Sequence, residues 1–263
     1  MVVISSLGIS KSLRVQGRYL VTRSKLQLLS FSTLQDDGSS LLDSFDFITQ
    51  IQQKQLNSLN NAIKNWNIKI NLISRKDIDN LMLHHIIPSL SVALLRRFST
   101  GDSVIDVGTG GGFPGLPLAI ICPEAHFTLL DSNSKKMQVL QSVVEELGLS
   151  NVKLAHSRAE AHVGVQYKYV LGRSVKSLPE FVGYTSHMLQ RSGRRTDSSS
   201  AGGEGGILYI KGGDIQPELN ELGIKHSSIH YMRDLITGLE TDKFVLHIPT
   251  ADVPAARVGK QRS

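Results

Sequence analysis

The chain has 263 residues, of which 40% are hydrophobic and 20% charged, an ordinary composition for a globular protein. A domain of this length buries roughly 70% or more of its extended surface, so one main core is expected. The sequence contains no run of about 18 apolar residues, and its single cysteine, Cys122, excludes an internal disulfide and a multi-cysteine metal site. We therefore expect no membrane partner, no metal and a reducing compartment, with the chain acting as a monomer and Cys122 as a small buried residue.

The net charge of +6 is concentrated near the amino terminus. Residues 1–35 are rich in serine, contain five basic residues and lack acids; without them, 24 basic residues face 23 acidic ones. This composition is typical of an organelle transit peptide. We predict a transit peptide over residues 1–35 that directs the protein to the chloroplast, with the mitochondrion as the alternative. A basic arm that contacts RNA phosphates is the other interpretation of this segment.

Residues 41–100 are predicted to form an N-terminal helical cap. Apolar residues recur there every three or four positions, as on one face of an amphipathic helix: Phe45, Ile48, Ile51, Leu56, Leu59 and Ile63. Residues 101–250 are predicted to be the main α/β domain, with a flexible, Gly/Ser/Arg-rich insertion at 190–206 and a basic tail at 251–263.

Short β-prone runs alternate with stretches of helix length in the main domain. The runs are residues 103–107, 126–131, 152–155, 168–172 and 206–211. Such alternation is typical of a largely parallel, doubly wound α/β sheet with helices on both faces.

The first of these strands runs into a glycine-rich loop, and together they read SVIDVGTGGGFPGLPLAI over residues 103–120. Glycines allow a sharp turn and the close approach of a ligand, and the helix that follows offers unpaired N–H groups. Asp106, Gly108, Gly110 and Gly112 fit the acidic-x-G-x-G-x-G pattern of S-adenosylmethionine sites. Phe113 stands where a dinucleotide G-x-G-x-x-G loop requires its third glycine, which disfavours a nicotinamide dehydrogenase. A purely structural turn is the remaining alternative.

Two later strand ends extend the predicted ligand site. Asp131 ends the second strand, where a carboxylate can accept both hydroxyls of a ribose, although it could also cap the next helix. Ala159 and Glu160 follow the third strand, at the edge where an adenine is expected.

On these residues the chain is similar to the RsmG or GidB family, the bacterial small-subunit rRNA guanine-N7 methyltransferases. The resemblance covers roughly residues 60–250 and is carried by residues 66–73, 84–90, 106–120, 123–136, 147–152, 157–160 and 172–174. It implies a seven-stranded methyltransferase sheet with an N-terminal helical extension, S-adenosylmethionine as methyl donor, and N7 of one guanine in small-subunit ribosomal RNA as target.

The resemblance also implies a set of site residues. The donor site comprises Gly108, Gly110, Phe113, Asp131, Ala159 and Glu160, with Arg173 near the reacting end as the catalytic candidate. The chain departs from the family at Pro88, where the family's HILDS segment has an acid, and at residues 172–174, where GRS replaces SRA. A non-catalytic RNA-binding or ribosome-assembly factor that keeps the fold is therefore the alternative function.

Guanine N7 carries a lone pair and no hydrogen, so its methylation requires alignment of the reactants and no general base. We expect Arg173 to hold a phosphate or the guanine O6, with a surface salt bridge as its alternative role. His84 and His85 are candidates for contacting the base, and Trp66 and Asn67 are expected to anchor the cap. The basic residues that are candidates for RNA phosphates are Arg96, Arg97, Lys135, Lys136, Arg191, Arg194, Arg195, Arg257, Lys260 and Arg262.

Overall fold

The computed structural model describes residues 38–191 and 205–255. The chain divides after Gln35, and every described residue belongs to the second unit, Asp36–Ser263. The predicted transit peptide, residues 192–204 of the predicted insertion and residues 256–263 of the basic tail lie outside the described residues.

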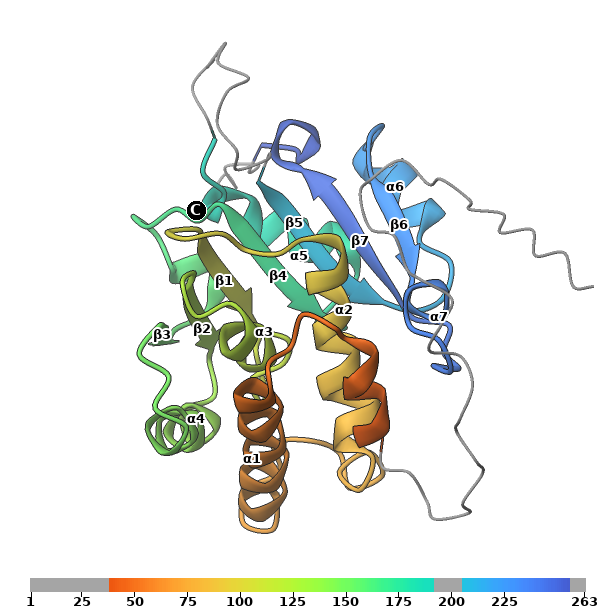
Figure 1. The fold of residues 1–263 in the computed structure, drawn as a ribbon. Coiled ribbons are helices and arrows are strands. Elements are labelled where there is room, and N and C mark those ends of the chain that lie inside the picture. Colours follow the sequence, from red (N-terminus) through yellow and green to blue (C-terminus); the bar gives the residue numbers. More distant parts are fainter. Residues whose placement is uncertain (1–37, 192–204, 256–263) are drawn as a thin grey trace, which may run out of the picture. The chain divides into compact units, whose positions relative to one another are not determined.

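The described residues form a seven-stranded sheet with the order β3-β2-β1-β4-β5-β7-β6 (Figure 1). The strands are β1 (Ser103–Val107), β2 (His126–Asp131), β3 (Val152–His156), β4 (Tyr169–Arg173), β5 (Gly206–Lys211), β6 (Ser228–Tyr231) and β7 (Phe244–Pro249). β1 to β5 pair in parallel, whereas β7 pairs antiparallel with both β5 and β6. The predicted doubly wound α/β sheet is confirmed, and all five predicted runs are strands. β6 and β7, which we did not predict from the residues, add the antiparallel edge.

The strands alternate their side chains between two apolar layers because successive residues of a strand point to opposite faces. Val104 and Leu129 belong to one buried cluster, and Ile105 and Leu130 belong to the other. The first layer is covered by α1 (Gln50–Asn67), α2 (Ile87–Leu95), α3 (Gly115–Ile121), α4 (Ser134–Glu146) and α7 (Met232–Leu235), and the second by α5 (Leu178–Thr185) and α6 (Gln216–Leu222) (Figure 1). Cys122 is buried after α3, as predicted.

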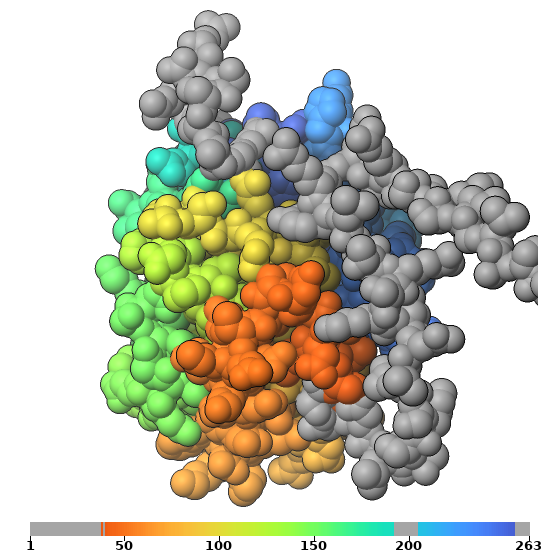
Figure 2. All heavy atoms as spheres, in the orientation of Figure 1, coloured from red at the N-terminus to blue at the C-terminus, as the bar shows by residue number. Residues whose placement is uncertain are grey.

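The helical cap is shorter and more interrupted than its apolar spacing predicted. α1 begins only at Gln50, where Thr49 and Gln52 form a reciprocal capping box. Phe45 and Ile48 precede the helix but are buried, whereas Ile51 is 72% exposed, so its assignment to the buried face is wrong. Figure 2 shows α1 in orange, with its outer side at the surface of the molecule.

A π-helix over Met82–Ile86 leads directly into α2. A π-helix is rare, occurs mostly as a single turn within an α-helix, and is frequently located at functional sites. Pro88, the second residue of α2, has no N–H to donate to the carbonyl four residues earlier, which is that of His84. The cap helix therefore offers a carbonyl to another part of the chain.

Candidate functional site

The glycine-rich loop joins β1 to α3 at the carboxyl edge of the sheet. Gly108, Gly110 and Gly112 have φ values of 71°, 59° and 91°, in the left-handed region where a side chain is strained. The amides of Gly108 and Thr109 both donate to the Leu130 carbonyl, at 2.8 and 3.1 Å. The loop is thereby fastened to the end of β2, and its three alternate glycines are required by the backbone itself.

Asp106 supports this loop from inside the protein. Its side chain is 1% exposed, and its Oδ2 accepts hydrogen bonds from Thr109 Oγ1 at 2.7 Å and from the Gly115 amide at 2.9 Å. Oδ1 is buried without a hydrogen-bond partner among the described residues. Burial raises the pKa of Asp106 to about 6, against the two hydrogen bonds that lower it. The carboxyl thus links the first turn of the loop to the start of α3. Contact between Asp106 and the methyl donor stays a prediction.

Asp131 faces the same loop from the end of β2. Its Oδ2 accepts a hydrogen bond from the Gly110 amide at 2.9 Å, and its Oδ1 accepts one from the Asn133 amide at 2.9 Å. The capping role that we considered for Asp131 belongs instead to Asn133, whose Oδ1 accepts from the Lys136 amide at the start of α4. Asp131 is partly exposed, and its carboxylate lies beside the glycine loop.

The faces of the loop differ in how closely the protein covers them. A Cβ added to Gly110 would meet no atom nearer than 3.9 Å, whereas on Gly108 it would lie 2.9 Å from Val175, and on Gly111 3.0 Å from Ile73. The sequence analysis gave no role in the site to Val175 or to Ile73, although Ile73 ends the segment 66–73 that carries part of the family resemblance. The face of the loop at Gly110 is therefore open, with Asp131 at its side, and we refer to this open face with Asp131 as the donor cradle.

Phe113, Ala159 and Glu160 lie in three different environments. Phe113 is 5% exposed, and its ring contacts His85 edge to face with 5.3 Å between centroids. Ala159 and Glu160 form a short 3-10 turn after β3; Ala159 is half-buried and Glu160 exposed. The Ser157 amide donates to the Asp131 carbonyl at 3.2 Å, so the end of β3 lies beside the end of β2. The structure thus brings the strand ends together and places Phe113 between the loop and the cap.

Arg173 ends β4 and joins the sheet to the cap. Its Nη2 donates to the His84 carbonyl at 2.6 Å, and its Nη1 donates to the His85 carbonyl at 3.3 Å. Pro88, four residues after His84, has no N–H to donate to this carbonyl. The surface salt bridge that we considered for Arg173 is absent from the described ranges, 38–191 and 205–255. Burial lowers the pKa of Arg173 to about 10, so the guanidinium remains charged at neutral pH.

Polar residues of the cap surround Arg173. His84 Nδ1 lies 3.1 Å from Asp77 Oδ1, and hydrogen bonds from Ser74 and His84 hold the pKa of Asp77 below its usual value. Burial, and then the nearby Arg173, lower the pKa of His85 to about 3, so its imidazole is neutral. Lys243, which the sequence analysis missed, is half-buried near Arg173, and burial followed by that charge lowers its pKa. The sequence feature that could have identified Lys243 is its position immediately before the apolar run of β7.

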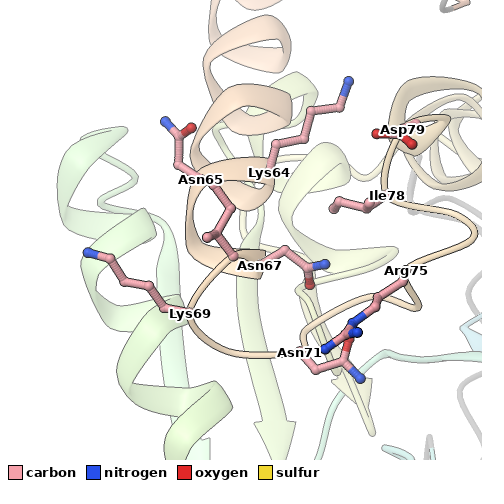
Figure 3. Close-up of a pocket in the computed structure, with 9 residues that line it drawn as sticks. Lys64, Asn65, Asn67, Lys69, Asn71, Arg75, Ile78 and Asp79 are labelled. Carbon is pink, nitrogen blue, oxygen red and sulfur yellow. The ribbon is translucent and has the colours of Figure 1, made fainter.

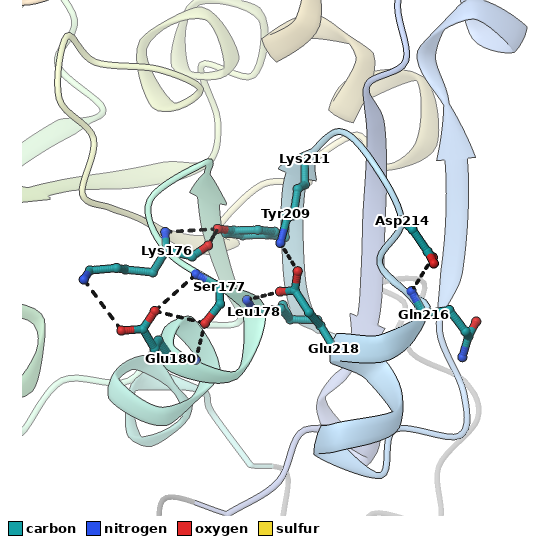
Figure 4. A network of polar contacts seen from close by, with 9 residues as sticks. All are labelled: Lys176, Ser177, Leu178, Glu180, Tyr209, Lys211, Asp214, Gln216 and Glu218. Carbon is teal, nitrogen blue, oxygen red and sulfur yellow. Dashed lines mark hydrogen bonds and ion pairs between the residues drawn. The ribbon is translucent and has the colours of Figure 1, made fainter.

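The loop after β4 is held by a polar network (Figure 4). Tyr209 Oη donates to the Lys176 carbonyl at 2.7 Å, and Glu218 accepts from the Leu178 amide at 2.5 Å and from the Lys211 ammonium. Ser174, at the start of this loop, has a φ of 46°, a conformation that costs a non-glycine residue of order 1 kcal/mol or more. The network stabilises the loop that places Val175 over Gly108.

Three of the predicted RNA-binding arginines are engaged within the protein. Arg96 Nε donates to Tyr169 Oη at 2.7 Å, Arg97 lies 4.4 Å from the ring centre of Phe47, and Arg191 Nη2 donates to the Val253 and Pro254 carbonyls. The Lys135 side chain is exposed, and the ammonium of Lys136 would lie 3.9 Å from a Cβ on Gly110. The other candidates, Arg194, Arg195, Arg257, Lys260 and Arg262, lie outside the described residues.

The parts of the chain that the structure describes contain no helix long and apolar enough to cross a membrane. Within the same ranges, His, Cys, Asp and Glu side chains do not gather in threes that could hold a metal ion.

The sheet order, the antiparallel β7 and the glycine loop beside Asp131 define a class I S-adenosylmethionine-dependent methyltransferase. The model of the GidB family, described as rRNA small subunit methyltransferase G, matches residues 52–234, and the chain belongs to this family.

Two relatives illustrate the similarity. Ribosomal RNA small subunit methyltransferase G of Flavobacterium johnsoniae is 39% identical over 211 residues, which cover 80% of this chain and 96% of that protein. The protein of the same name from Christiangramia forsetii is 42% identical over 177 residues, covering 67% and 81%. Among solved structures, a SAM-dependent O-methyltransferase from Thermotoga maritima aligns over 71% of each chain with 13% identity and a TM-score of 0.47.

Proposed function

We propose that this protein transfers the methyl group of S-adenosylmethionine to N7 of a guanine in small-subunit ribosomal RNA. The proposal is supported by membership of the family and by the names of its relatives. The observation that carries the donor site is the hydrogen bond from the Gly110 amide to Asp131 beside an open glycine face. This arrangement offers a nucleoside both a carboxylate and a backbone surface without side chains.

The residues of the cradle fit the donor. Asp131 would accept hydrogen bonds from the ribose hydroxyls, the glycine loop would contact the amino-acid portion, and Ala159 and Glu160 would border the adenine. When bound, the donor supplies an electrophilic methyl group. Guanine N7 already holds its lone pair, so no side chain has to remove a proton. The protein's task is to align the two partners, an effect that supplies roughly 7 to 11 kcal/mol.

The surroundings of Arg173 agree with a reaction that needs no base. His85 is neutral because burial holds its pKa near 3, and Arg173 remains a cation bound to helix carbonyls. Arg173 therefore acts by holding the cap against β4, with contact to a phosphate or to guanine O6 as its further expected role.

The two departures from the family pattern are accommodated by the fold, so they give the non-catalytic alternative little support. Pro88 has no N–H to donate to the His84 carbonyl, and this carbonyl accepts a hydrogen bond from Arg173. At Gly172 a Cβ would lie 2.4 Å from the Phe181 ring, so glycine is the residue that fits.

The test is a methylation assay with the full chain, labelled S-adenosylmethionine and small ribosomal subunits that lack the modification. We expect label on one guanine, at N7. Label on no RNA, together with no binding of S-adenosylmethionine by calorimetry, would favour the non-catalytic RNA-binding or ribosome-assembly factor. The wild type is compared with Asp131→Asn, which we expect to be inactive.

We further propose that the serine-rich, acid-free first 35 residues direct the protein to the chloroplast. We also propose that it acts there as a monomer. A fluorescent reporter fused after residue 35 should enter plastids. Entry into mitochondria would select the alternative compartment, and a diffuse signal would contradict the transit peptide. Sedimentation of the purified chain tests the monomer.

A further inference from the structure

A pocket of about 580 Å³ opens on the helical cap, at the end of α1 and in the segment that follows it (Figure 3). Its lining combines three basic side chains with three amides: Lys64, Lys69, Arg75, Asn65, Asn67 and Asn71. Among its lining residues Asp79 is the acid, so the lining carries an excess of positive charge. None of these residues belongs to the donor cradle.

The basic side chains of the pocket have no carboxylate partner among the described residues. Within the residues that the structure describes, no carboxylate lies within 4.0 Å of the charged groups of Lys64, Lys69 or Arg75. The Lys69 ammonium lies 5.2 Å from the ring centre of Trp66, an uncharged partner. The basic side chains of the pocket thus differ from Arg96, Arg97 and Arg191, whose side chains contact other groups of the protein.

The backbone of the pocket is held in place before any ligand arrives. Asn67 Oδ1 accepts hydrogen bonds from the amides of Leu72 and Ile73, at 2.8 and 2.9 Å, and Trp66 packs against the main core. This confirms the anchoring role that we predicted for Trp66 and Asn67. A backbone that is already held in place adds little to the conformational entropy lost when the pocket binds a ligand.

The same segment reaches the donor cradle. Ile73, two residues after Asn71 of the pocket, lies 3.0 Å from the position of a Cβ on Gly111. Asp77, two residues after Arg75, pairs with His84 of the π-helix that Arg173 binds. One continuous stretch of chain therefore connects the pocket with the glycine loop and with the π-helix that Arg173 binds.

We propose that the pocket binds a backbone phosphate of the ribosomal RNA beside the target guanine. The proposal rests on the proposed function of the protein. Phosphate oxygens only accept hydrogen bonds, and the ammonium, guanidinium and amide N–H groups of the lining all donate. A phosphate held there would position the RNA strand relative to the donor cradle without reading its sequence.

The experiment compares two triple variants of the full chain that each lose three positive charges. The pocket variant is Lys64→Gln, Lys69→Gln, Arg75→Gln. The control is Lys54→Gln, Lys153→Gln, Lys225→Gln, at three exposed lysines without a described ion pair. Thermal unfolding verifies that both are folded. Dissociation constants for an in vitro transcript of bacterial small-subunit rRNA are measured at several salt concentrations.

Each phosphate contact to single-stranded RNA contributes about 0.7 to the slope of log affinity against log salt. Because the pocket is proposed to hold one phosphate, we expect the pocket variant to lose about 0.7 from this slope and at least tenfold in affinity at low salt. The control should keep the wild-type slope. In the methylation assay the pocket variant should raise KM for RNA at least tenfold, by more than it lowers kcat.

Equal slopes for the two triple variants would overturn the pocket proposal, even if the wild type methylates RNA normally. A wild type that methylates no RNA would overturn the proposed function instead, while the slopes still decide whether the pocket binds RNA. Inorganic phosphate, added at constant ionic strength, separates the two sources of phosphate. If millimolar phosphate competes with RNA for the wild type, the pocket is a free-phosphate site and the proposal fails.

Discussion

Replacing Asp106 with asparagine should change how the stability of the protein depends on pH. The folded-state pKa of Asp106 is raised to about 6 from the reference value of 3.8 because the carboxyl is buried. A raised pKa means that the folded state binds the proton more tightly than the unfolded state, so protonation of Asp106 stabilises the folded protein at low pH. This stabilisation is lost as the pH rises through about 6. A difference of about 2 pKa units between the folded and unfolded states corresponds to about 3 kcal/mol of unfolding free energy, reached when the pH lies below both pKa values.

When the pH is lowered from 7 to 5, the free energy of unfolding of the wild type should rise by about 1.4 kcal/mol relative to that of Asp106→Asn. The asparagine oxygen can still accept both loop hydrogen bonds, whereas its amide is buried where Oδ1 has no partner, at a cost that does not depend on pH. Urea unfolding at pH 5, 6 and 7 measures the difference, with Asp43→Asn, at an exposed position, as the matched control. Parallel pH profiles for wild type and Asp106→Asn would refute the reasoning.

Three further substitutions test separate parts of the site. Asp131→Ala should weaken S-adenosylmethionine binding more than tenfold, as measured by calorimetry. Asn133→Ala, which removes the cap of α4, should cost about 1 kcal/mol of stability and leave the donor affinity unchanged. Equal donor affinities for the two variants would contradict the ribose-binding role of Asp131. Arg173→Met leaves a buried helix carbonyl without its donor and should cost about 1–3 kcal/mol in urea unfolding, with Arg173→Lys restoring part of the loss; a neutral Arg173→Met would refute the tie between cap and sheet. Gly112→Ala places a Cβ 2.3 Å from a leucine side chain, so its melting temperature should fall further than that of Gly148→Ala, where φ is also positive but no atom lies within 4 Å.

The sequence predicted the parts of the site that follow from local pattern. An apolar run before alternate glycines predicted β1 and its loop, and an aspartate 25 positions later predicted the end of β2. These features are local because a parallel strand is a short apolar run and its turn is set by residues that tolerate positive φ. Asp131 and Gly110 then meet because adjacent parallel strands end at the same edge of the sheet.

Contacts between distant segments could not be predicted in the same way. Arg173 binds carbonyls almost ninety positions earlier in the chain, and backbone carbonyls carry no sequence signal. Val175 and Ile73 cover the glycine loop as ordinary apolar side chains. The spacing that placed Ile51 on the buried face was misleading because the chain first turns at Phe45 and Ile48, so α1 starts with a different phase.

The attachment of Arg173 to the π-helix couples two motions that would otherwise be independent. If the cap shifted to admit RNA while β4 stayed in place, a buried guanidinium would lose its acceptors, and a helix carbonyl would lose its donor. Any rearrangement of the cap must therefore carry the end of β4 with it or break both hydrogen bonds together. If RNA binding shifts the cap, RNA binding and donor binding would be coupled through Arg173, and by thermodynamic reciprocity each ligand would change the affinity for the other by the same factor.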